Sequence, residues 1–307
     1  MSPAETTGIR LPGTDRLLRR MGLGAMHLSI PGRPERARAT EVVQRAVELG
    51  VTLIDTADAY ALDDTEHGHN EVLVVEALRG MGVDPHDAEA PVVATKGGRS
   101  RPAGEWALDA HPDRLRDACH ASLRRMGLER IPLYQLHQPD PVVPFADSVG
   151  ALARLAEEGK IEAVGLSNVG AKQLAEADAI VPIASVQNSF SPWDTGGRKP
   201  EILERCEEGG RVFMAYGPLG GRDRAPTLSE SDMLVAVGRR LGASPQELVL
   251  AWLLAYSPAL VPIPGARRVA SVESSARAAS LALTAEDLDA VGRALGSLPG
   301  RPGLVRR

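Results

Sequence analysis

Several features that mark particular protein classes are scarce in this sequence. Only two cysteines, Cys119 and Cys206, occur among 307 residues, which is too few for a disulfide framework or a zinc cage. The longest apolar run, Leu248 to Tyr256, is far shorter than the ~20 residues that a membrane helix requires. The net charge of −5 disfavours general affinity for nucleic acid. We therefore expect neither a membrane nor a nucleic-acid partner.

The remaining composition is that of a globular protein. Hydrophobic residues make up 43% of the chain and charged residues 24%, so the apolar side chains suffice for a large core. The first residues, Met1 to Glu5, contain neither the basic nor the apolar region of a secretion signal. We expect a cytoplasmic protein.

Short β-rich runs alternate with longer helical patterns along the chain. Residues such as Gly50, Gly127 and Gly159 end the helical patterns, as glycine commonly does. The repeated order of strand, helix and glycine indicates parallel strands with crossover helices, and eight such units favour a closed (β/α)8 TIM barrel of the α/β class. The predicted strands are Arg20–Ala25, Val51–Thr56, Val92–Lys96, Leu133–His137, Ala163–Ser167, Ala184–Asn188, Val212–Tyr216 and Leu260–Pro264.

Two segments lie outside this repeat. Ile9 to Leu18 has Pro12-Gly13-Thr14-Asp15 at its centre and predicts a short N-terminal hairpin. Thr284 followed by acidic residues predicts the start of an extra C-terminal helix. Because no linker divides the chain, we expect residues 1–307 to form a single domain with its barrel core at about 20–296.

Familiar nucleotide and metal motifs are absent or incomplete. Gly22-Leu23-Gly24 begins like a dinucleotide fingerprint, but His27 stands where the third glycine is needed for close helix packing. His67 and His69 follow two aspartates after the second strand, but we interpret them as solvated loop residues and expect no metal site.

Four ionisable residues follow three adjacent predicted strands. They are Asp55, Tyr60, Lys96 and His137, and active sites of barrels form where the strands end. An ammonium beside a phenol favours the phenolate and lowers its pKa, and a carboxylate keeps that ammonium charged. Tyr60 is thus predicted to be a general acid tuned by Lys96 and Asp55, with His137 orienting a carbonyl oxygen. Neither a nucleophile nor a metal is evident, so a cofactor must supply electrons.

With these residues in place, the chain resembles the aldo-keto reductases from Arg20 to about Gly296. The resemblance rests on Asp55-Thr56-Ala57-x-x-Tyr60, Thr95-Lys96, Leu136-His137, Gly165-Leu166-Ser167-Asn168, Val186-Gln187-Asn188 and Ile263-Pro264-Gly265. It implies a barrel that binds NADPH without a Rossmann domain and reduces an aldehyde or ketone to an alcohol, with Tyr60 as the proton donor.

The resemblance also implies the cofactor contacts. Ser167, Asn168 and Gln187 would bind the nicotinamide carboxamide, and Tyr216 would stack on the nicotinamide ring. Phosphate recognition would involve the loops after the seventh and eighth strands. In the second of these loops, Arg267 and Arg268 favour NADPH over NADH because guanidinium groups suit a 2′-phosphate. The predicted residues of these loops are Leu219, Gly220, Gly221, Gly265, Arg267 and Arg268.

The chain departs from many family members in two places. Ser274 and Ser275 stand where adenine-binding Glu and Asn are common, so we assign them no role. The segment between Tyr216 and Asp232 is too short for the long loop that covers the pyrophosphate in many relatives. This short form is similar to the branch that contains bacterial pyridoxal reductases.

The substrate is expected to be a small carbonyl compound. Its pocket would be lined by His27, Trp106, Gln138 and Trp193, which combine flat apolar walls with polar contacts. Two other functions remain open: a non-catalytic, nucleotide-sensing binding module of the same fold, and a cofactor-free barrel hydrolase or lyase. We expect a monomer or a weak homo-oligomer.

Overall fold

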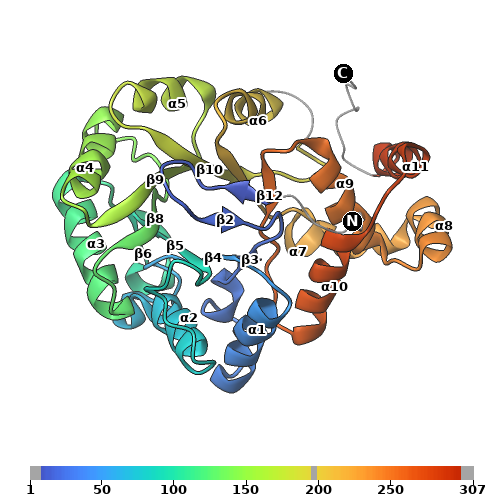
Figure 1. Ribbon diagram of the computed structural model, residues 1–307, viewed down its shortest axis with the longest axis horizontal. Coiled ribbons are helices and arrows are strands. Elements are labelled where there is room, and N and C mark those ends of the chain that lie inside the picture. The colour runs from blue at the N-terminus through green and yellow to red at the C-terminus, as the bar shows by residue number, and fades with distance from the viewer. Residues whose placement is uncertain (1–7, 195–198, 299–307) are drawn as a thin grey trace.

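A curled sheet of eight parallel strands forms the centre of the molecule (Figure 1). The computed structural model describes residues 8–194 and 199–298. Gly22 N–H donates to Pro262 O at 2.9 Å and Gly24 N–H to Pro264 O at 3.1 Å, so the last strand returns to the first. The strands follow in the order β3 (Leu23–Gly24), β4 (Leu53–Asp55), β5 (Val92–Gly97), β8 (Ile131–Leu136), β9 (Ile161–Ser167), β10 (Ile183–Ser189), β11 (Val212–Tyr216) and β12 (Leu260–Pro262).

Helices surround this sheet and carry the chain from one strand to the next. Between β3 and β11 they are α1 (Arg36–Glu48), α2 (His69–Arg79), α3 (Pro112–Met126), α4 (Phe145–Glu157), α5 (Ala171–Asp178) and α6 (Lys199–Glu208). After β11 they are α7 (Gly221–Arg224), α8 (Asp232–Leu241), α9 (Pro245–Tyr256), α10 (Val269–Ser280) and α11 (Ala285–Gly296). The predicted (β/α)8 barrel is therefore confirmed. Among the described residues, none of the helices is long and apolar enough to cross a membrane.

The boundaries differ most from the sequence prediction at the first two strands. β3 has two residues where Arg20–Ala25 was predicted, and β4 has three where Val51–Thr56 was predicted. Directly after Ala25 the chain turns into a 3-10 helix at Met26–Leu28, which limits β3 at that end. The extra C-terminal helix is present as α11. Its N-terminus is closed by a capping box in which Thr284 and Asp287 accept each other's backbone N–H groups.

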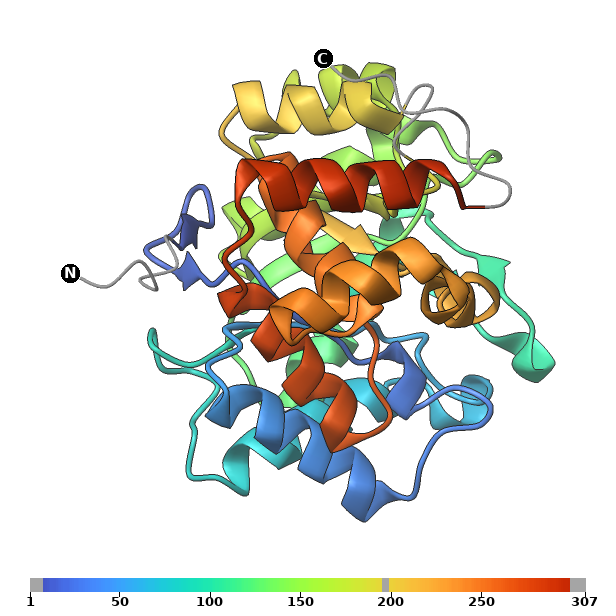
Figure 2. The same cartoon turned by 90° about the vertical axis from the view of Figure 1, so that its right-hand side faces the viewer.

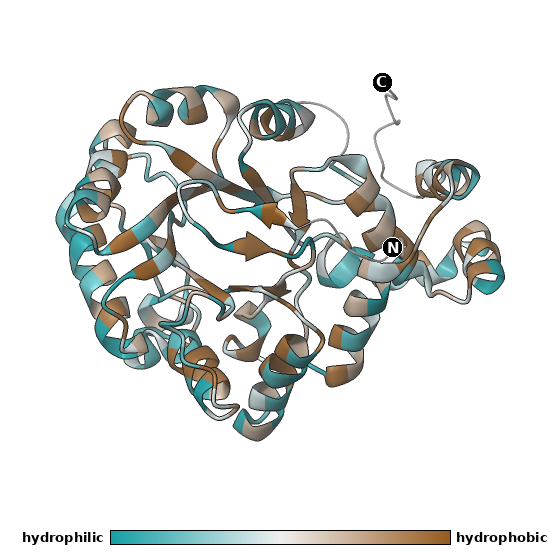
Figure 3. Cartoon of the chain, in the orientation of Figure 1, coloured by the Kyte–Doolittle hydropathy of each residue, from teal (hydrophilic) through white to brown (hydrophobic). Residues whose placement is uncertain are grey.

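Two apolar clusters hold the barrel together. The larger lies between the strands and the surrounding helices, whose brown inner faces and teal outer faces alternate in Figure 3. The smaller fills the barrel interior with side chains such as Leu53, Leu133 and Met214. Leu11 and Leu18 join this interior cluster from the N-terminal hairpin, and both are fully buried. The hairpin therefore closes the end where the strands begin.

A second hairpin lies at the opposite end of the barrel. The first hairpin, predicted from the sequence, pairs β1 (Ile9–Arg10) with β2 (Leu17–Leu18). The second, β6 (Arg99–Ser100) with β7 (Ala107–Leu108), follows directly from β5 and was not predicted. Figure 2 shows the first hairpin to the left of the barrel and the second to its right. The β6–β7 hairpin lies at the end where the strands finish, and there the carboxyl ends of the strands line a cavity.

Candidate active site

All four ionisable residues predicted from the strand ends are brought together by the structure. Asp55 is the last residue of β4, Lys96 lies near the end of β5, and His137 follows β8. Tyr60 lies in the turn after β4. Asp55, Tyr60 and His137 line one cavity of about 800 Å³ at the open end of the barrel. This is the end at which active sites of such barrels form.

Lys96 is at the centre of the group and is completely buried. Its Nζ contacts the two Asp55 carboxylate oxygens at 2.7 and 2.8 Å and donates to Tyr60 Oη at 2.8 Å. The third partner is the Thr56 carbonyl oxygen, also at 2.8 Å. Three partners satisfy all three protons of an ammonium group. The lysine is therefore fixed between the carboxylate and the phenol.

The electrostatics of Tyr60 differ from the sequence prediction. Burial raises the pKa of Tyr60 well above its ordinary value, and the Asp55 carboxylate raises it further. Arg99 opposes this rise. The predicted lowering of this pKa is wrong for this structure because removal of the phenolate from water is the larger effect. Tyr60 is consequently protonated at neutral pH, as a proton donor must be.

His137 faces the same space. Its ring contacts the Tyr60 ring edge to face, with centroids 5.6 Å apart. Its buried Nδ1 has no hydrogen-bond partner within the described chain. Burial lowers the pKa of His137 well below its ordinary value, and the positive charges of Lys96 and Arg99 lower it further. The imidazole is therefore neutral near pH 7, with one N–H to donate.

The predicted nicotinamide contacts lie on the neighbouring strand ends. Gln187 donates from Nε2 to Asp55 Oδ1 at 2.7 Å, which ties it to the lysine network. Asn168 has a φ of 60°, a left-handed conformation that asparagine tolerates better than most residues. Its Oδ1 accepts from Tyr216 Oη at 2.8 Å, and its Nδ2 donates to the His137 carbonyl at 3.0 Å. Ser167 completes this wall of the cavity.

The other end of the cavity is basic. Leu219, Gly220, Gly221, Gly265 and Arg267 line it as predicted, and Arg222, which was not predicted, joins them. Burial lowers the pKa of His27, and the positive charges of Arg267 and Arg222, which line the same cavity, lower it further. A Cβ on Gly265 would lie 2.6 Å from the His27 ring, so a larger residue would intrude there. Arg268 is exposed and does not line the cavity.

Three of the four predicted substrate-pocket residues line the cavity, namely His27, Trp106 and Gln138. Trp193 is not among the lining residues, so the cavity does not support its assignment as a pocket wall. It is only 4% exposed and packs beneath Gly220, where an added Cβ would lie 2.6 Å from its ring. Gly220, in the turn after β11, also has a φ of 80°, a left-handed conformation that favours glycine. Its backbone conformation and its close contact with the indole therefore both require glycine. Trp193 thus supports the loop instead of contacting the cavity.

The sequence reasoning gave no individual role to two further sets of residues. Arg99 lies in the loop from Gly98 to Trp106, which the sequence predicts for the substrate pocket, and it lines the cavity, but neither its own role nor the hairpin that carries it was predicted. Asn70 and Glu71 of α2 are fully buried behind the site. Asn70 contacts Thr56 at 2.6 Å, and Glu71 accepts from Thr95 at 2.6 Å, so each holds a residue beside the lysine network. Their burial could not be predicted from the sequence because polar residues on helices are usually exposed.

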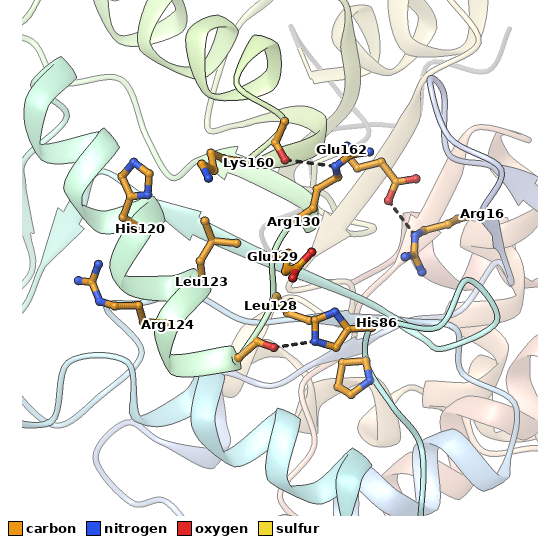
Figure 4. Close-up of a pocket in the computed structure, with 13 residues that line it drawn as sticks. Arg16, His86, His120, Leu123, Arg124, Leu128, Glu129, Arg130, Lys160 and Glu162 are labelled. Atoms are coloured by element: carbon orange, nitrogen blue, oxygen red, sulfur yellow. Dashed lines mark hydrogen bonds and ion pairs between the residues drawn. The ribbon is translucent and has the colours of Figure 1, made fainter.

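A second cavity, of about 910 Å³, lies around the starts of β8 and β9 and is lined by charged residues (Figure 4). Its charged side chains include Arg16, Arg124, Lys160 and Glu162, and it contains none of the predicted site residues. Among residues 8–194 and 199–298, no cluster of His, Cys, Asp or Glu has the arrangement of a metal site.

Comparison with known proteins agrees with this geometry. The model of the aldo/keto reductase family matches residues 20–295. An uncharacterised oxidoreductase of Schizosaccharomyces pombe is 34% identical over 89% of this chain and 85% of its own. The structure of a glycerol dehydrogenase from Gluconobacter oxydans has a TM-score of 0.81 and 27% identity, covering 97% and 98% of the two chains. An aldo-keto reductase from Klebsiella pneumoniae, in complex with NADPH, has a TM-score of 0.77 and 24% identity over 97% and 96%.

Proposed function

The chain belongs to the aldo/keto reductase family, and from this premise we propose that it reduces an aldehyde or ketone to the alcohol with NADPH as electron donor. One observation carries the proposal. The buried Lys96 ammonium joins the Asp55 carboxylate to the Tyr60 hydroxyl at 2.7 and 2.8 Å, next to the cavity. This arrangement supplies a positioned proton donor and leaves the electrons to come from elsewhere.

In this proposal Tyr60 and His137 act on the carbonyl oxygen. NADPH, when bound, would supply a hydride for the carbonyl carbon. Tyr60 transfers its hydroxyl proton to the oxygen, and the neutral His137 donates a hydrogen bond to that oxygen as negative charge develops. Lys96 and Asp55 keep the Tyr60 hydroxyl at one place. Together the hydride and the proton give the alcohol.

The donors and acceptors along the cavity fit this cofactor. Nε2 of Gln187 is held by Asp55, so Oε1 is left to accept from a carboxamide N–H. Asn168 Oδ1 has a second lone pair beyond the Tyr216 bond. Tyr216 lines the cavity beside them, and its ring offers a stacking surface for nicotinamide. Arg267 and Arg222 lie at the other end, where their charges suit phosphate groups.

A titration with each nucleotide tests the proposal. NADPH and then NADH are added to the purified protein, and nicotinamide fluorescence and protein quenching are recorded. We expect saturable binding of NADPH, tighter than that of NADH, followed by turnover of pyridoxal or simple aromatic aldehydes. Failure of both nucleotides to bind would overturn the proposal, because the assignments of Ser167, Tyr216 and Arg267 would fall together.

A further inference from the structure

The hairpin that follows β5 brings an aromatic and a cationic side chain to the reacting groups. Trp106, directly before β7, is 41% exposed, yet it contacts Tyr60 edge to face with ring centroids 6.4 Å apart. The centroid of the His137 ring lies 6.2 Å from the centroid of the Trp106 ring. Any substrate whose carbonyl reaches Tyr60 and His137 therefore passes beside this indole.

Arg99 lies on the same hairpin and lines the cavity. Its guanidinium carbon is 5.4 Å from the centre of the Trp106 ring, and its Nη2 donates to Gln138 Oε1. Its Nε is buried and has no hydrogen-bond partner within residues 8–194 and 199–298, nor does Arg99 form an ion pair there. A half-buried cation with an unused donor is costly unless an anion joins it.

The carboxylates that line the cavity do not provide this anion. Asp55 is bound to Lys96 and Gln187. Asp194 accepts from Ser191 Oγ at 2.8 Å and from Ser189 Oγ at 3.3 Å. Both acidic groups are therefore engaged elsewhere, and the positive charge of Arg99 remains directed at the cavity.

The positive charge of Arg99 also affects the pKa values of His137 and Tyr60. It contributes to the low pKa of His137 and opposes the burial that raises the pKa of Tyr60. Arg99, Tyr60 and His137 line the same cavity, and each of them contacts the Trp106 ring, so a substrate held by Tyr60 and His137 lies in the space that Arg99 also faces. Arg267 and Arg222 lie at the other end of the cavity, so Arg99 is separate from the proposed phosphate contacts.

We propose that Arg99 binds an anionic group of the substrate, so that this enzyme prefers carbonyl compounds that carry a carboxylate or phosphate. The inference rests on the proposed reductase function. The guanidinium would form charge-assisted, two-pronged hydrogen bonds to the anion. The body of the substrate would lie against Trp106, and its carbonyl would point to Tyr60 and His137.

Two aldehydes that differ in charge provide the test. 4-Formylbenzoate and its methyl ester share the same benzaldehyde body, but only the first is anionic. The ester group withdraws electrons more strongly and activates its aldehyde, so the test compares how the carboxylate-to-ester ratio of kcat/KM changes between the wild type and the variant. We expect the wild-type enzyme to reduce the carboxylate with the higher kcat/KM. Arg99→Gln should lower kcat/KM for the carboxylate about 10- to 100-fold, mainly through KM, and change the ester less than about threefold. 4-Formylphenyl phosphate shows whether phosphate is preferred to carboxylate.

Two variants serve as controls. Arg99→Lys keeps the charge but loses the planar fork, so part of the preference should return. Arg116→Gln removes the same charge from an exposed position on α3 outside the cavity lining, and should leave the carboxylate-to-ester ratio unchanged. Equal losses for the two aldehydes in Arg99→Gln would overturn the inference. Equal losses would indicate a structural role for Arg99.

Binding of the alcohol product separates this inference from the proposed function. 4-(Hydroxymethyl)benzoate is titrated by calorimetry into wild type and Arg99→Gln, each in the presence of NADPH. Binding that is lost in the variant supports the anion site even if no aldehyde is reduced, in which case only the reductase proposal fails. Equal affinity for wild type and variant, or no binding to either, contradicts the anion site.

Discussion

The two ends of the barrel hold cavities of similar size but with different surroundings. At the end where the strands begin, the cavity of about 910 Å³ is lined by charged residues, of which Arg16 and Glu162 form an ion pair at 3.1 Å (Figure 4). At the other end, the cavity of about 800 Å³ meets a buried carboxylate, a tyrosine and a histidine. Volume therefore does not identify the site. Burial of ionisable groups does, because charges are removed from water only where other interactions compensate.

The same contrast appears in the hairpins. The β1–β2 hairpin places two leucines in the barrel interior and closes that end. The β6–β7 hairpin instead places Arg99 and Trp106 at the edge of the cavity. Substitutions at the end with the β6–β7 hairpin should therefore affect catalysis, and substitutions at the end with the β1–β2 hairpin should affect stability.

Removal of the Tyr60 hydroxyl should have the largest effect. Tyr60→Phe deletes the proton donor but keeps the ring that contacts Trp106 and His137. We expect kcat for aldehyde reduction to fall at least ~10²-fold, while NADPH affinity stays within about threefold of wild type. Steady-state rates and nucleotide titration measure the two quantities. Undiminished turnover would show that another group donates the proton.

The next largest effect is expected on NADPH affinity, where two adjacent arginines should behave differently. Arg267 lines the cavity and its guanidinium lies near the Pro31–Gly32 turn, whereas Arg268 is exposed beside it. Arg267→Ala should weaken NADPH about 10- to 100-fold and NADH much less, because the lost charge faces a 2′-phosphate. Arg268→Ala should change either affinity less than about threefold. Equal losses of NADPH and NADH in Arg267→Ala would argue against this contact.

The pH dependence of reduction should be small. The pKa of Tyr60 is raised, so the phenol stays protonated as pH increases, and a loss of rate is expected only when pH approaches that raised value. The pKa of His137 is lowered, so it stays neutral as pH decreases from 7. Between about pH 6 and about pH 9, kcat should therefore vary less than about threefold. A steep fall above neutral pH would mean that the pKa of Tyr60 is low during reduction.

The smallest effect is expected at the closed end. Glu162→Gln removes the ion pair with Arg16, whose two side chains are 23% and 12% exposed. The free energy of unfolding should fall by about 0.5–1 kcal/mol, and kcat/KM should stay within about twofold. Urea denaturation and aldehyde reduction provide the two measurements. A tenfold loss of activity would contradict the assignment of catalysis to the open end.

Local patterns of the sequence predicted much of the architecture. The eight strands, the N-terminal hairpin and α11 follow from β-rich runs, glycine stops and an N-cap, which act over a few residues. Asp55, Lys96 and His137 could be identified because each stands at or directly beyond an apolar strand. Arg99 offered no such signal, since its hairpin consists of two-residue strands.

The sequence by itself therefore determined the order of the elements and the chemical groups at the strand ends. The tertiary structure decided which of them share a cavity and how deeply each is buried. It placed Trp193 beneath a loop, separated Arg267 from Arg268 and brought Arg99 into the cavity that Tyr60 and His137 line. It also reversed the expected shift of the Tyr60 pKa. Desolvation and long-range charge depend on residues distant in sequence, so they exist only once the barrel has closed.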